Sequence, residues 1–313
     1  MSDIAILVPS YNHAPFIERT LRSIFAQTRR PKQLIVIDDG SKDESPQIIK
    51  RVLNECPFDN VFIARENRGL CSTLNEGLSK TCGEYFAYLG SDDIWLPDFL
   101  AEQFDLLESR PGAVLTFSHA FVIDEDNNII DRTDNWTAFA DGDMLPNLLR
   151  GEIFSSPGVL YRRSPLDKYG WNENAVLEDY ELYLNLSFEG EFARNEKLLC
   201  AWRQHGWNTS DNFHAMLREQ IDAQDRNLEK LGITREELNK IQAELKFNSV
   251  PNLIRSGHKR EAWQMFRENI GAALPIGKIA KTALRLAVPA PIFRWNRMRV
   301  RRNAARRYGK LVV

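Results

Sequence analysis

The chain has 313 residues, 43% of them hydrophobic and 10% aromatic, and its formal net charge is −2. This length and composition predict a soluble globular protein with a sizeable core, built as two domains or as one domain with an extension. The four cysteines lack Cys-x-x-Cys spacing, the N-terminus resembles a strand and not a signal peptide, and no apolar stretch approaches the roughly 20 residues of a membrane span. We therefore expect a cytoplasmic protein without a membrane-spanning segment.

The small net charge conceals a polarised chain. Residues 269–313 contain eleven of the 41 Lys and Arg and none of the 43 Asp and Glu. The body is therefore acidic and the tail is basic. A tail of this kind is typical of a segment that meets a polyanion, either nucleic acid or an anionic membrane surface.

The first part of the chain alternates short apolar strands with amphipathic helices. Strands are predicted at 4–8, 34–37, 61–64 and 85–89, and helices at 16–25, at 70–78 and from Pro97 to residue 107. This alternation is typical of an α/β fold with a mainly parallel sheet. Polar residues or glycines follow each strand, so we expect one edge of the sheet to gather them and to bind the ligand.

Two adjacent carboxylates, Asp92 and Asp93, follow the strand at 85–89. Mg²⁺ or Mn²⁺ takes one or two carboxylates and completes its coordination with the phosphate oxygens of a nucleotide. The Gly-x-Gly-x-x-Gly fingerprint and the Walker phosphate loop are both missing after the first strand, which argues against simple dehydrogenases and P-loop proteins. A cation would then neutralise the phosphates. The alternative is an Asp-rich turn that caps the following helix.

The middle of the chain is less regular. Strands are predicted at 114–118, 121–123, 159–163 and 200–203, and the acidic run at 124–128 is interpreted as a solvated loop. Asp179 begins a helix, where the helix dipole stabilises a carboxylate, so capping is an alternative to a catalytic role. His205 follows the strand at 200–203. The other four histidines have no partner pattern and receive no role.

Beyond residue 210 the chain is expected to be helical. Helices are predicted at 216–231, at 234–254 with a capping box of Thr234 and Glu237, and at 259–270. Residues 276–308 interleave apolar side chains and a tryptophan with arginines, which predicts an interfacial helix pair broken at Pro289 and Pro291. The alternative is a basic helix packed against the acidic body.

Taken together, the polar motifs resemble those of the inverting family-2 glycosyltransferases, which have the GT-A fold. The matching residues lie in the family's order between residues 4 and 210: Pro9-Ser10-Tyr11-Asn12, Asp38-Asp39-Gly40-Ser41 with Asp43, Asn67-Arg68-Gly69 with Asn75 and Gly77, Ser91-Asp92-Asp93, Glu178-Asp179, and Arg203-Gln204-His205 with Asn208-Thr209-Ser210. Each motif is weak alone, but the ordered set is specific. The resemblance implies a GT-A mixed sheet flanked by helices, with a helical C-terminal extension.

The resemblance also implies roles for individual residues. Tyr11 would pack on the base, Asp39 would hydrogen-bond the base or ribose, and Arg68 would lie near the nucleotide. Asp92 would touch the ribose or the sugar, and Pro9 and Glu178 would also contact the substrate. Asp93 would bind the Mg²⁺ or Mn²⁺ that bridges the diphosphate, with His205 as a further metal or diphosphate ligand. Displacement at the anomeric carbon needs a base opposite the leaving nucleotide, and by family position this base is Asp179.

We therefore predict a metal-dependent inverting glycosyltransferase with a nucleotide-sugar region at 1–115, an acceptor and catalytic region at 116–210 and a helical extension at 211–313. The donor would be a nucleotide diphosphate sugar, with a UDP-sugar preferred. The basic tail favours a lipid-linked glycan acceptor at the inner face of the cell membrane, as in O-antigen or capsule synthesis, with 276–313 bound peripherally to anionic lipid. A processive synthase is disfavoured, because Gln-x-x-Arg-Trp and transmembrane helices are missing.

Three alternatives remain open at the level of sequence. A sugar-nucleotide pyrophosphorylase should show a glycine-rich loop with Arg and Lys after the first strand, where this chain has Pro9-Ser10-Tyr11-Asn12. A catalytically silent module that binds nucleotide sugars would carry the same motifs. A nucleic-acid-binding protein could use the basic tail, but the acidic body and the lack of a reader motif argue against nucleic acid as a partner.

Overall fold

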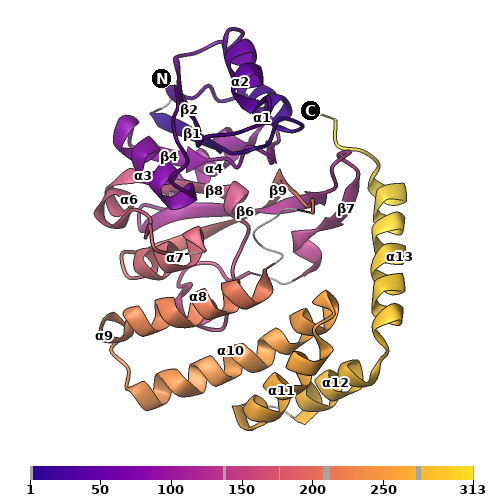
Figure 1. The fold of residues 1–313 in the computed structure, drawn as a ribbon. Coiled ribbons are helices and arrows are strands. Elements are labelled where there is room, and N and C mark those ends of the chain that lie inside the picture. Colours follow the sequence, from indigo (N-terminus) through magenta and orange to yellow (C-terminus); the bar gives the residue numbers. More distant parts are fainter. Residues whose placement is uncertain (1–2, 137–138, 176, 207–211, 273–275, 313) are drawn as a thin grey trace.

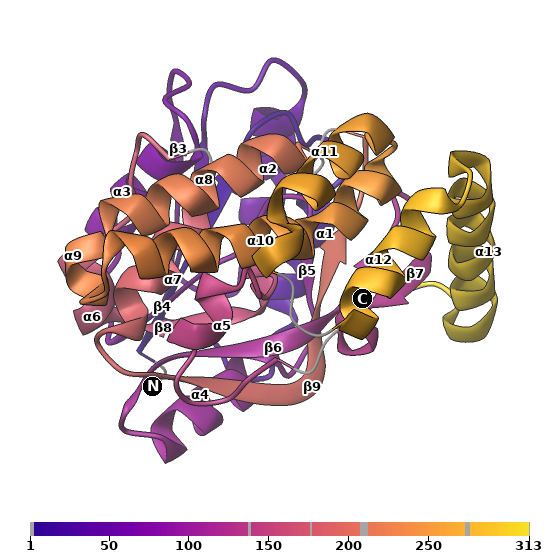
Figure 2. The same cartoon turned by 90° about the horizontal axis from the view of Figure 1, so that it is seen from below.

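The computed structural model describes residues 3–136, 139–175, 177–206, 212–272 and 276–312. Its centre is a single nine-stranded mixed sheet with helices on both faces, and further helices form a layer below it (Figures 1 and 2). The strand order is β3 (Asn60–Ala64), β2 (Gln33–Asp38), β1 (Ile4–Ser10), β4 (Tyr85–Tyr88), β8 (Val159–Arg162), β6 (Ala113–Ile123), β9 (Glu191–Arg203) and β5 (Ile94–Trp95), with β7 (Ile129–Arg132) paired to β6.

The first four strands confirm the predicted parallel arrangement. β1 pairs in parallel with both β2 and β4, and β2 with β3. The chain therefore builds outward from β1 to β3 and then crosses to the other side of β1 to form β4. This reversal is a topological switch point, the place where open α/β sheets bind their ligands.

The second half of the sheet contains strands of both directions, which confirms the mixed sheet that the family resemblance implied. β8 runs antiparallel to β4 and β6, whereas β6 and β9 are parallel. The two strands predicted at 114–118 and 121–123 are one strand, β6, with irregular register around His119. His119 and the amide of Ala120 bond to the Thr133 hydroxyl, which satisfies buried polar groups that would otherwise break the strand.

Helices cover both faces of the sheet. One face packs against α1 (Ile17–Phe25), α2 (Ser45–Leu53) and α4 (Phe99–Ser109), and the other against α3 (Leu70–Lys80), α5 (Leu145–Leu149), α6 (Arg163–Tyr169), α7 (Glu178–Ser187) and α8 (Phe213–Arg226). In β1 the side chains of Ile6 and Val8 enter the core beneath α1, α2 and α4, whereas Leu7 enters the core on the other face of the sheet. The side chains alternate because successive residues of a strand face opposite sides. Burial on both faces explains the uninterrupted apolar runs.

The helical extension has a small core of its own. The extension contains α9 (Leu228–Leu231), α10 (Arg235–Ser256), α11 (Lys259–Asn269) and α12 (Ile276–Ala287). The last three of these helices bury Phe247, Leu253, Phe266 and Leu286 together. The predicted capping box is confirmed, since Thr234 and Glu237 exchange hydrogen bonds at the start of α10. No helix in the described parts of the chain is long and apolar enough to cross a membrane.

The basic tail ends in α13 (Ala290–Tyr308), which runs along one side of the molecule toward β7 (Figure 1). The predicted break at Pro289 is confirmed, but Pro291 lies in the first turn of α13, where the missing N–H has no helical partner to lose. After α13, Gly309 accepts a hydrogen bond from the Ile129 amide and Leu311 donates one to the Asn127 carbonyl. The end of the tail thus packs on the body, as in the second of the two sequence interpretations.

Candidate active site

The candidate site lies at the switch point, at the carboxyl ends of β1 and β4. Pro9 is buried within β1 beside Ile37 of β2, so it belongs to the strand and not to the loop that follows. Asn12 takes a positive φ of 53° in that loop, and its side chain and amide bond to residues 42 and 41 of the loop after β2. The Tyr11 ring is exposed at this edge. These contacts join the first two polar motifs into one wall.

Asp39 connects the end of β2 to the third motif. Its two carboxylate oxygens accept hydrogen bonds from the amides of Arg68 (2.9 Å) and Gly69 (2.8 Å). Arg65, which sequence reasoning passed over, lies 2.5 Å from the same carboxylate and also pairs with Glu76. Asp39 therefore shapes the 65–69 loop. Each of its carboxylate oxygens already accepts one amide, so a base or ribose would bind to the remaining lone pairs. The side chain of Arg68 is exposed.

The turn after β4 presents Asp92 and Asp93 around Gly90. The Thr20 hydroxyl of α1 holds this turn by donating to the carbonyls of Ser91 (3.0 Å) and Asp93 (2.7 Å). A Cβ atom at position 90 would lie 3.0 Å from Asp92 Oδ1 and 3.2 Å from Asp93 Oδ2. A side chain larger than glycine would therefore crowd both carboxylates. Asp92 Oδ1 and Asp93 Oδ2 thus both border the space beside Gly90.

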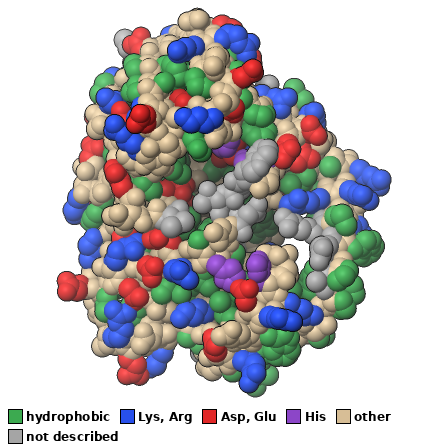
Figure 3. Space-filling model, in the orientation of Figure 1, with side chains coloured by type: hydrophobic (Ala, Val, Ile, Leu, Met, Phe, Trp, Pro, Cys, Tyr) green, Lys and Arg blue, Asp and Glu red, His purple; other side chains and the backbone are tan. Residues whose placement is uncertain are grey.

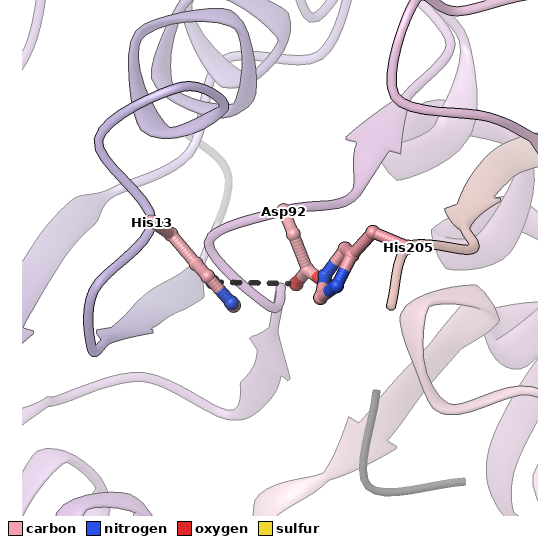
Figure 4. Close-up of side chains that lie close together, drawn as sticks. All are labelled: His13, Asp92 and His205. Carbon is pink, nitrogen blue, oxygen red and sulfur yellow. Dashed lines mark hydrogen bonds and ion pairs between the residues drawn. The ribbon is translucent and has the colours of Figure 1, made fainter. Parts of the chain in front are cut away.

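His205 and His13 converge on Asp92 (Figure 4). His205 Nε2 lies 3.0 Å from Asp92 Oδ2, and His13 Nδ1 lies 3.7 Å from Asp92 Oδ1 and 2.7 Å from the Ser91 hydroxyl. One ligand atom from each of His13, Asp92 and His205 lies within 4.8 Å of the others. The sequence suggested no role for His13, whereas the structure places its imidazole beside Asp92. Its position directly after the first motif was the available signal.

The two adjacent carboxylates differ in their environment. Burial raises the pKa of Asp92, but the hydrogen bond from His205 and the proximity of His13 outweigh burial and leave this pKa below its ordinary value. Burial and the negative charge of Asp92 raise the pKa of Asp93 well above its ordinary value. Asp93 Oδ1 also accepts the Arg203 amide at 2.8 Å. The structure therefore brings Asp92, and not Asp93, into direct contact with His205.

Arg203 is completely buried behind these groups and binds several of them together. Its guanidinium donates to the carbonyls of Asp92 and Asp124 and to the side chain of Asn127, each at 2.7 Å. The Phe16 ring lies 4.8 Å from this guanidinium and stacks on the imidazole of His205, with the ring centroids 5.3 Å apart. Phe16 and Arg203 thus fix the orientation of His205 and of the Asp92–Asp93 turn. Neither orientation could be recognised from the sequence.

Glu178 and Asp179 begin α7 beside the end of β4. Glu178 Oε1 lies 3.4 Å from the Tyr88 hydroxyl, and its charge contributes to the raised pKa of Asp93, so the two acidic motifs share one electrostatic environment. Asp179 is only 7% exposed, and burial together with the charge of Glu178 raises its pKa well above the ordinary value. Its Oδ1 atom has no hydrogen-bond partner among the described residues. Leu177 occupies the N-cap position, where no side chain caps the helix.

The residues present fit a divalent cation. Asp92, His13 and His205 supply one carboxylate and two imidazoles, and Asp93 and the phosphate oxygens of a bound nucleotide would add oxygen ligands. Imidazole suits transition metals better than it suits Mg²⁺, whose ligands are oxygens. The mixed set therefore favours Mn²⁺ over Mg²⁺. The motif residues Asn208, Thr209 and Ser210 lie outside the described residues.

Comparison with known proteins agrees with this geometry. The profile of the family described as "Glycosyl transferase family 2" matches residues 5–170. The chain is 28% identical over 234 residues to the chondroitin synthase of Escherichia coli, an alignment that covers 74% of this chain and 33% of that protein. The residues matched by the family profile include β2 to β8 and the motifs up to Asp92–Asp93, whereas Asp179, β9 and His205 follow them in the sequence.

Two solved structures share the fold. A mannosyltransferase from Pyrobaculum calidifontis, in complex with GDP-Man and Mn²⁺, superposes with a TM-score of 0.62 at 18% identity, covering 97% of this chain and 86% of that one. Residues 1–349 of S. aureus TarS, in complex with UDP-GlcNAc, give a TM-score of 0.59 at 17% identity, covering 98% and 91%. The fold is therefore GT-A, and the chain belongs to glycosyl transferase family 2, whose inverting enzymes transfer a sugar from a nucleotide sugar.

Proposed function

We propose that the enzyme transfers a sugar from a nucleotide diphosphate sugar to a hydroxyl group of a glycan, in a reaction that requires a divalent cation. The observation that carries this proposal is the presence of two unlike chemical groups linked by Glu178, whose charge acts on both Asp93 and Asp179. One is the metal-ligating cluster around Asp92, and the other is the buried carboxyl of Asp179 with its unpartnered oxygen. A cation held by the Asp92 cluster would stabilise the departing diphosphate, and the Asp179 carboxylate would accept the proton of the attacking hydroxyl group.

We infer that the donor is a UDP-sugar lying along the wall formed by the first three motifs. The exposed Tyr11 ring is available for stacking on the base, Asp39 for the base or ribose, and Arg68 for the nucleotide. Pro9, buried in β1, sets the direction in which Tyr11 leaves the strand. The preference for uridine rests on TarS, which shares the fold and was solved with UDP-GlcNAc. The mannosyltransferase with GDP-Man makes guanosine the alternative.

Asp92 and His205 would hold the cation, with His13 and Asp93 beside them. A bound cation acts as a Lewis acid that stabilises the charge developing on the diphosphate. The protein's own part is to keep these ligands in place through Arg203, Phe16 and Thr20, all of which are held in the core of the fold. Such preorganised ligands need no rearrangement when charge develops.

Asp179 would act as the base. The acceptor oxygen forms its bond to the anomeric carbon while the bond from that carbon to the diphosphate oxygen breaks, and the hydroxyl proton passes to the Asp179 carboxylate. A raised pKa makes the carboxylate a stronger base than an exposed aspartate, and positioned proton transfer contributes typically 10²–10⁴-fold. Glu178, which raises that pKa, also lies where it could contact the transferred sugar.

For the acceptor we propose a lipid-linked glycan at the inner face of the cell membrane. Ile292, Trp295 and Met298 are exposed on α13, and Trp295 and Met298 share a shallow surface hollow with Arg299 and Arg302. Apolar side chains beside arginines on an acid-free helix fit the interface of an anionic membrane. The tail would then bind lipid with this side while its end stays fixed to β7.

The decisive experiment is a transfer assay with purified protein. A panel of UDP-sugars and GDP-mannose is incubated with and without Mn²⁺ and with soluble or lipid-linked glycans, and nucleotide release and product mass are measured. We expect Mn²⁺-dependent transfer from one donor. If the protein binds a donor but neither transfers nor hydrolyses it with any of the acceptors, it is a silent binding module. Formation of a nucleotide sugar from a nucleoside triphosphate and a sugar 1-phosphate would identify a pyrophosphorylase.

A further inference from the structure

A second group of metal-ligating side chains lies outside the active site, where α8 meets α11. His214 is the second residue of α8, His258 immediately precedes α11, and Glu261 lies in its first turn. One candidate ligand atom from each of these three side chains lies within 4.8 Å of the others. Histidine side chains touch an acidic side chain on the lower half of the surface in Figure 3. All three side chains are half-exposed, so an ion can reach them from solvent.

The separation of His258 and Glu261 suits a small tetrahedral ion, whereas His214 and Glu261 form a closer ion pair. His258 Nδ1 lies 3.3 Å from Glu261 Oε1, and His214 Nε2 pairs with the other oxygen of the same carboxylate. Ligand atoms around a tetrahedral zinc ion with bonds of about 2.0–2.2 Å are separated by about 3.3 Å. The two imidazole rings are nearly perpendicular, at 87°, with centroids 5.2 Å apart, so both nitrogens face the carboxylate without stacking.

His214 adds a second observation. Its Nε2 atom is shielded from solvent although the ring is half-exposed, and it has no partner of hydrogen-bond geometry among the described residues. The nitrogen is therefore in an ion pair with the carboxylate but outside the usual geometry of a hydrogen bond. An ion bound by both groups would replace this close contact with two metal–ligand bonds.

The backbone holds the three ligands in place. α10 ends at Gly257, whose φ is 92°, and the His258 amide then donates to the Leu253 carbonyl at 2.9 Å. The Ala262 amide donates to the His258 carbonyl at 2.9 Å, which starts α11 and places Glu261 one turn from His258. On the other side, Phe213 packs against the core of the helical extension and fixes its neighbour His214. Ligands on rigid elements are the condition for a specific site.

We propose that His214, His258 and Glu261 form a zinc site, with water in the fourth position. Two neutral imidazoles and one carboxylate are a ligand set that zinc accepts, and they differ from the oxygen ligands that Mg²⁺ prefers. The ion joins the first turn of α8 to α11. Because α8 follows closely after His205 in the sequence, the site fixes the chain where it leaves the active site and enters the helical extension.

The test is a zinc titration of metal-free protein against a chromophoric chelator. The active-site cluster also offers zinc ligands, so the titration is performed in an Asp92→Asn, His205→Ala background, where we expect one zinc equivalent to remain. Adding Glu261→Gln should weaken its binding by at least about tenfold, since even residues that merely orient zinc ligands contribute 10–100-fold. Glu268→Gln, an exposed acid on the same helix, is the matched control and should leave binding unchanged.

A second readout keeps this result separate from the catalytic proposal. Zinc should raise the melting temperature of the background protein and of the Glu268→Gln control, but not that of Glu261→Gln or His258→Ala, because only a ligand bound to the folded state stabilises it. Circular dichroism without metal verifies that each variant is folded. Equal zinc affinity of Glu261→Gln and Glu268→Gln, or binding only at millimolar zinc, would overturn the proposal whatever the transfer assay shows.

Discussion

Asp179 combines a proposed catalytic role with surroundings that disfavour its ionised form. Its carboxyl group is buried, one oxygen lacks a hydrogen-bond partner among the described residues, and its pKa is raised by burial and by Glu178. A raised pKa in the folded state means that the folded protein holds the proton to higher pH than the unfolded chain does. The free energy of unfolding therefore falls as pH rises from the ordinary Asp range through the raised pKa.

Asp179→Asn should separate the two effects. Transfer should fall by at least about a hundredfold, because an amide cannot accept the proton. The free energy of unfolding should rise relative to wild type by about 1.4 kcal/mol for each unit by which the pKa is raised, and the difference should grow with pH. Denaturant unfolding of both proteins at several pH values measures this. Asp222→Asn, an exposed acid on α8, is the control, and loss of stability in Asp179→Asn would point to a structural role.

Glu178 provides a second test at the same scale. If Asp179 is the base, transfer should increase with pH through the raised pKa of Asp179, since only the carboxylate accepts the proton. Glu178→Gln removes a negative charge that raises this pKa, so the acidic limb of the kcat/KM profile should move to lower pH. A limb that stays in place in this variant would assign it to a group other than Asp179.

The choice between Asp92 and Asp93 is also a question about single residues. The sequence resemblance assigns the metal to Asp93, whereas the structure places Asp92 beside both imidazoles. Asp92→Asn should therefore weaken Mn²⁺ binding by at least about tenfold, and by more than Asp93→Asn does. Titration of metal-free protein with Mn²⁺, followed by its electron paramagnetic resonance signal, gives both affinities. The opposite ranking would restore the sequence assignment.

At the scale of elements, the end of the tail and the active site share the turn between β6 and β7. Leu311 donates to the Asn127 carbonyl, the side chain of Asn127 accepts from Arg203, and Arg203 donates to the Asp92 carbonyl. Arg301 of α13 also donates to Gln204, next to His205, at 2.5 Å. Three successive hydrogen bonds thus connect the last residues of the chain to the Asp92–Asp93 turn.

Truncation after Tyr308 should consequently affect the distant site. We expect a lower melting temperature and several-fold weaker Mn²⁺ binding, because the 124–128 turn loses the strand-like partner that holds Asn127. Leu311→Ala, which keeps the backbone hydrogen bond, is the matched control and should retain Mn²⁺ affinity. Unchanged Mn²⁺ affinity after truncation would show that Arg203 needs no support from the tail.

At the scale of the whole molecule, the polarised charge determines how the protein would approach a membrane. Deleting 276–313 would be an unsuitable test, because Leu286 belongs to the core of the helical extension and Tyr308 packs against β7. Point changes on the exposed side of α13 avoid this difficulty. Trp295 is 58% exposed there, and Trp263 of α11 is 44% exposed elsewhere on the extension.

Trp295→Glu should reduce cosedimentation with anionic phosphatidylglycerol vesicles and transfer to a lipid-linked acceptor, while transfer to a soluble acceptor stays near wild type. Trp263→Glu makes the same change away from α13 and should leave vesicle binding largely intact. High salt should mimic Trp295→Glu, since screening limits charge attraction to about 10 Å at 0.1 M. Equal effects of the two changes, or no vesicle binding at low salt, would contradict the membrane proposal. The region boundaries at 115 and 210 stay predictions.

The sequence by itself determined the elements whose signals are local. Apolar runs located β1 to β4 because buried parallel strands are apolar on both faces, and helical spacing and the Thr234 capping box located most helices. It also determined that Asp92, Asp179 and His205 belong to one ordered set of motifs. Short strands such as β5, which has two residues, carry no periodicity of their own.

Only the tertiary structure decided which of these groups meet. The contact of Asp92 with His205 joins residues 113 positions apart, and His13 reaches the same carboxylate from the loop that follows β1. Sequence spacing contains no information on such distances, because they arise from the crossing of the chain at the switch point. The apolar and basic pattern of the tail likewise fits both lipid and protein partners. Only the packing of Tyr308 and Leu311 shows that the end of the tail docks on β7.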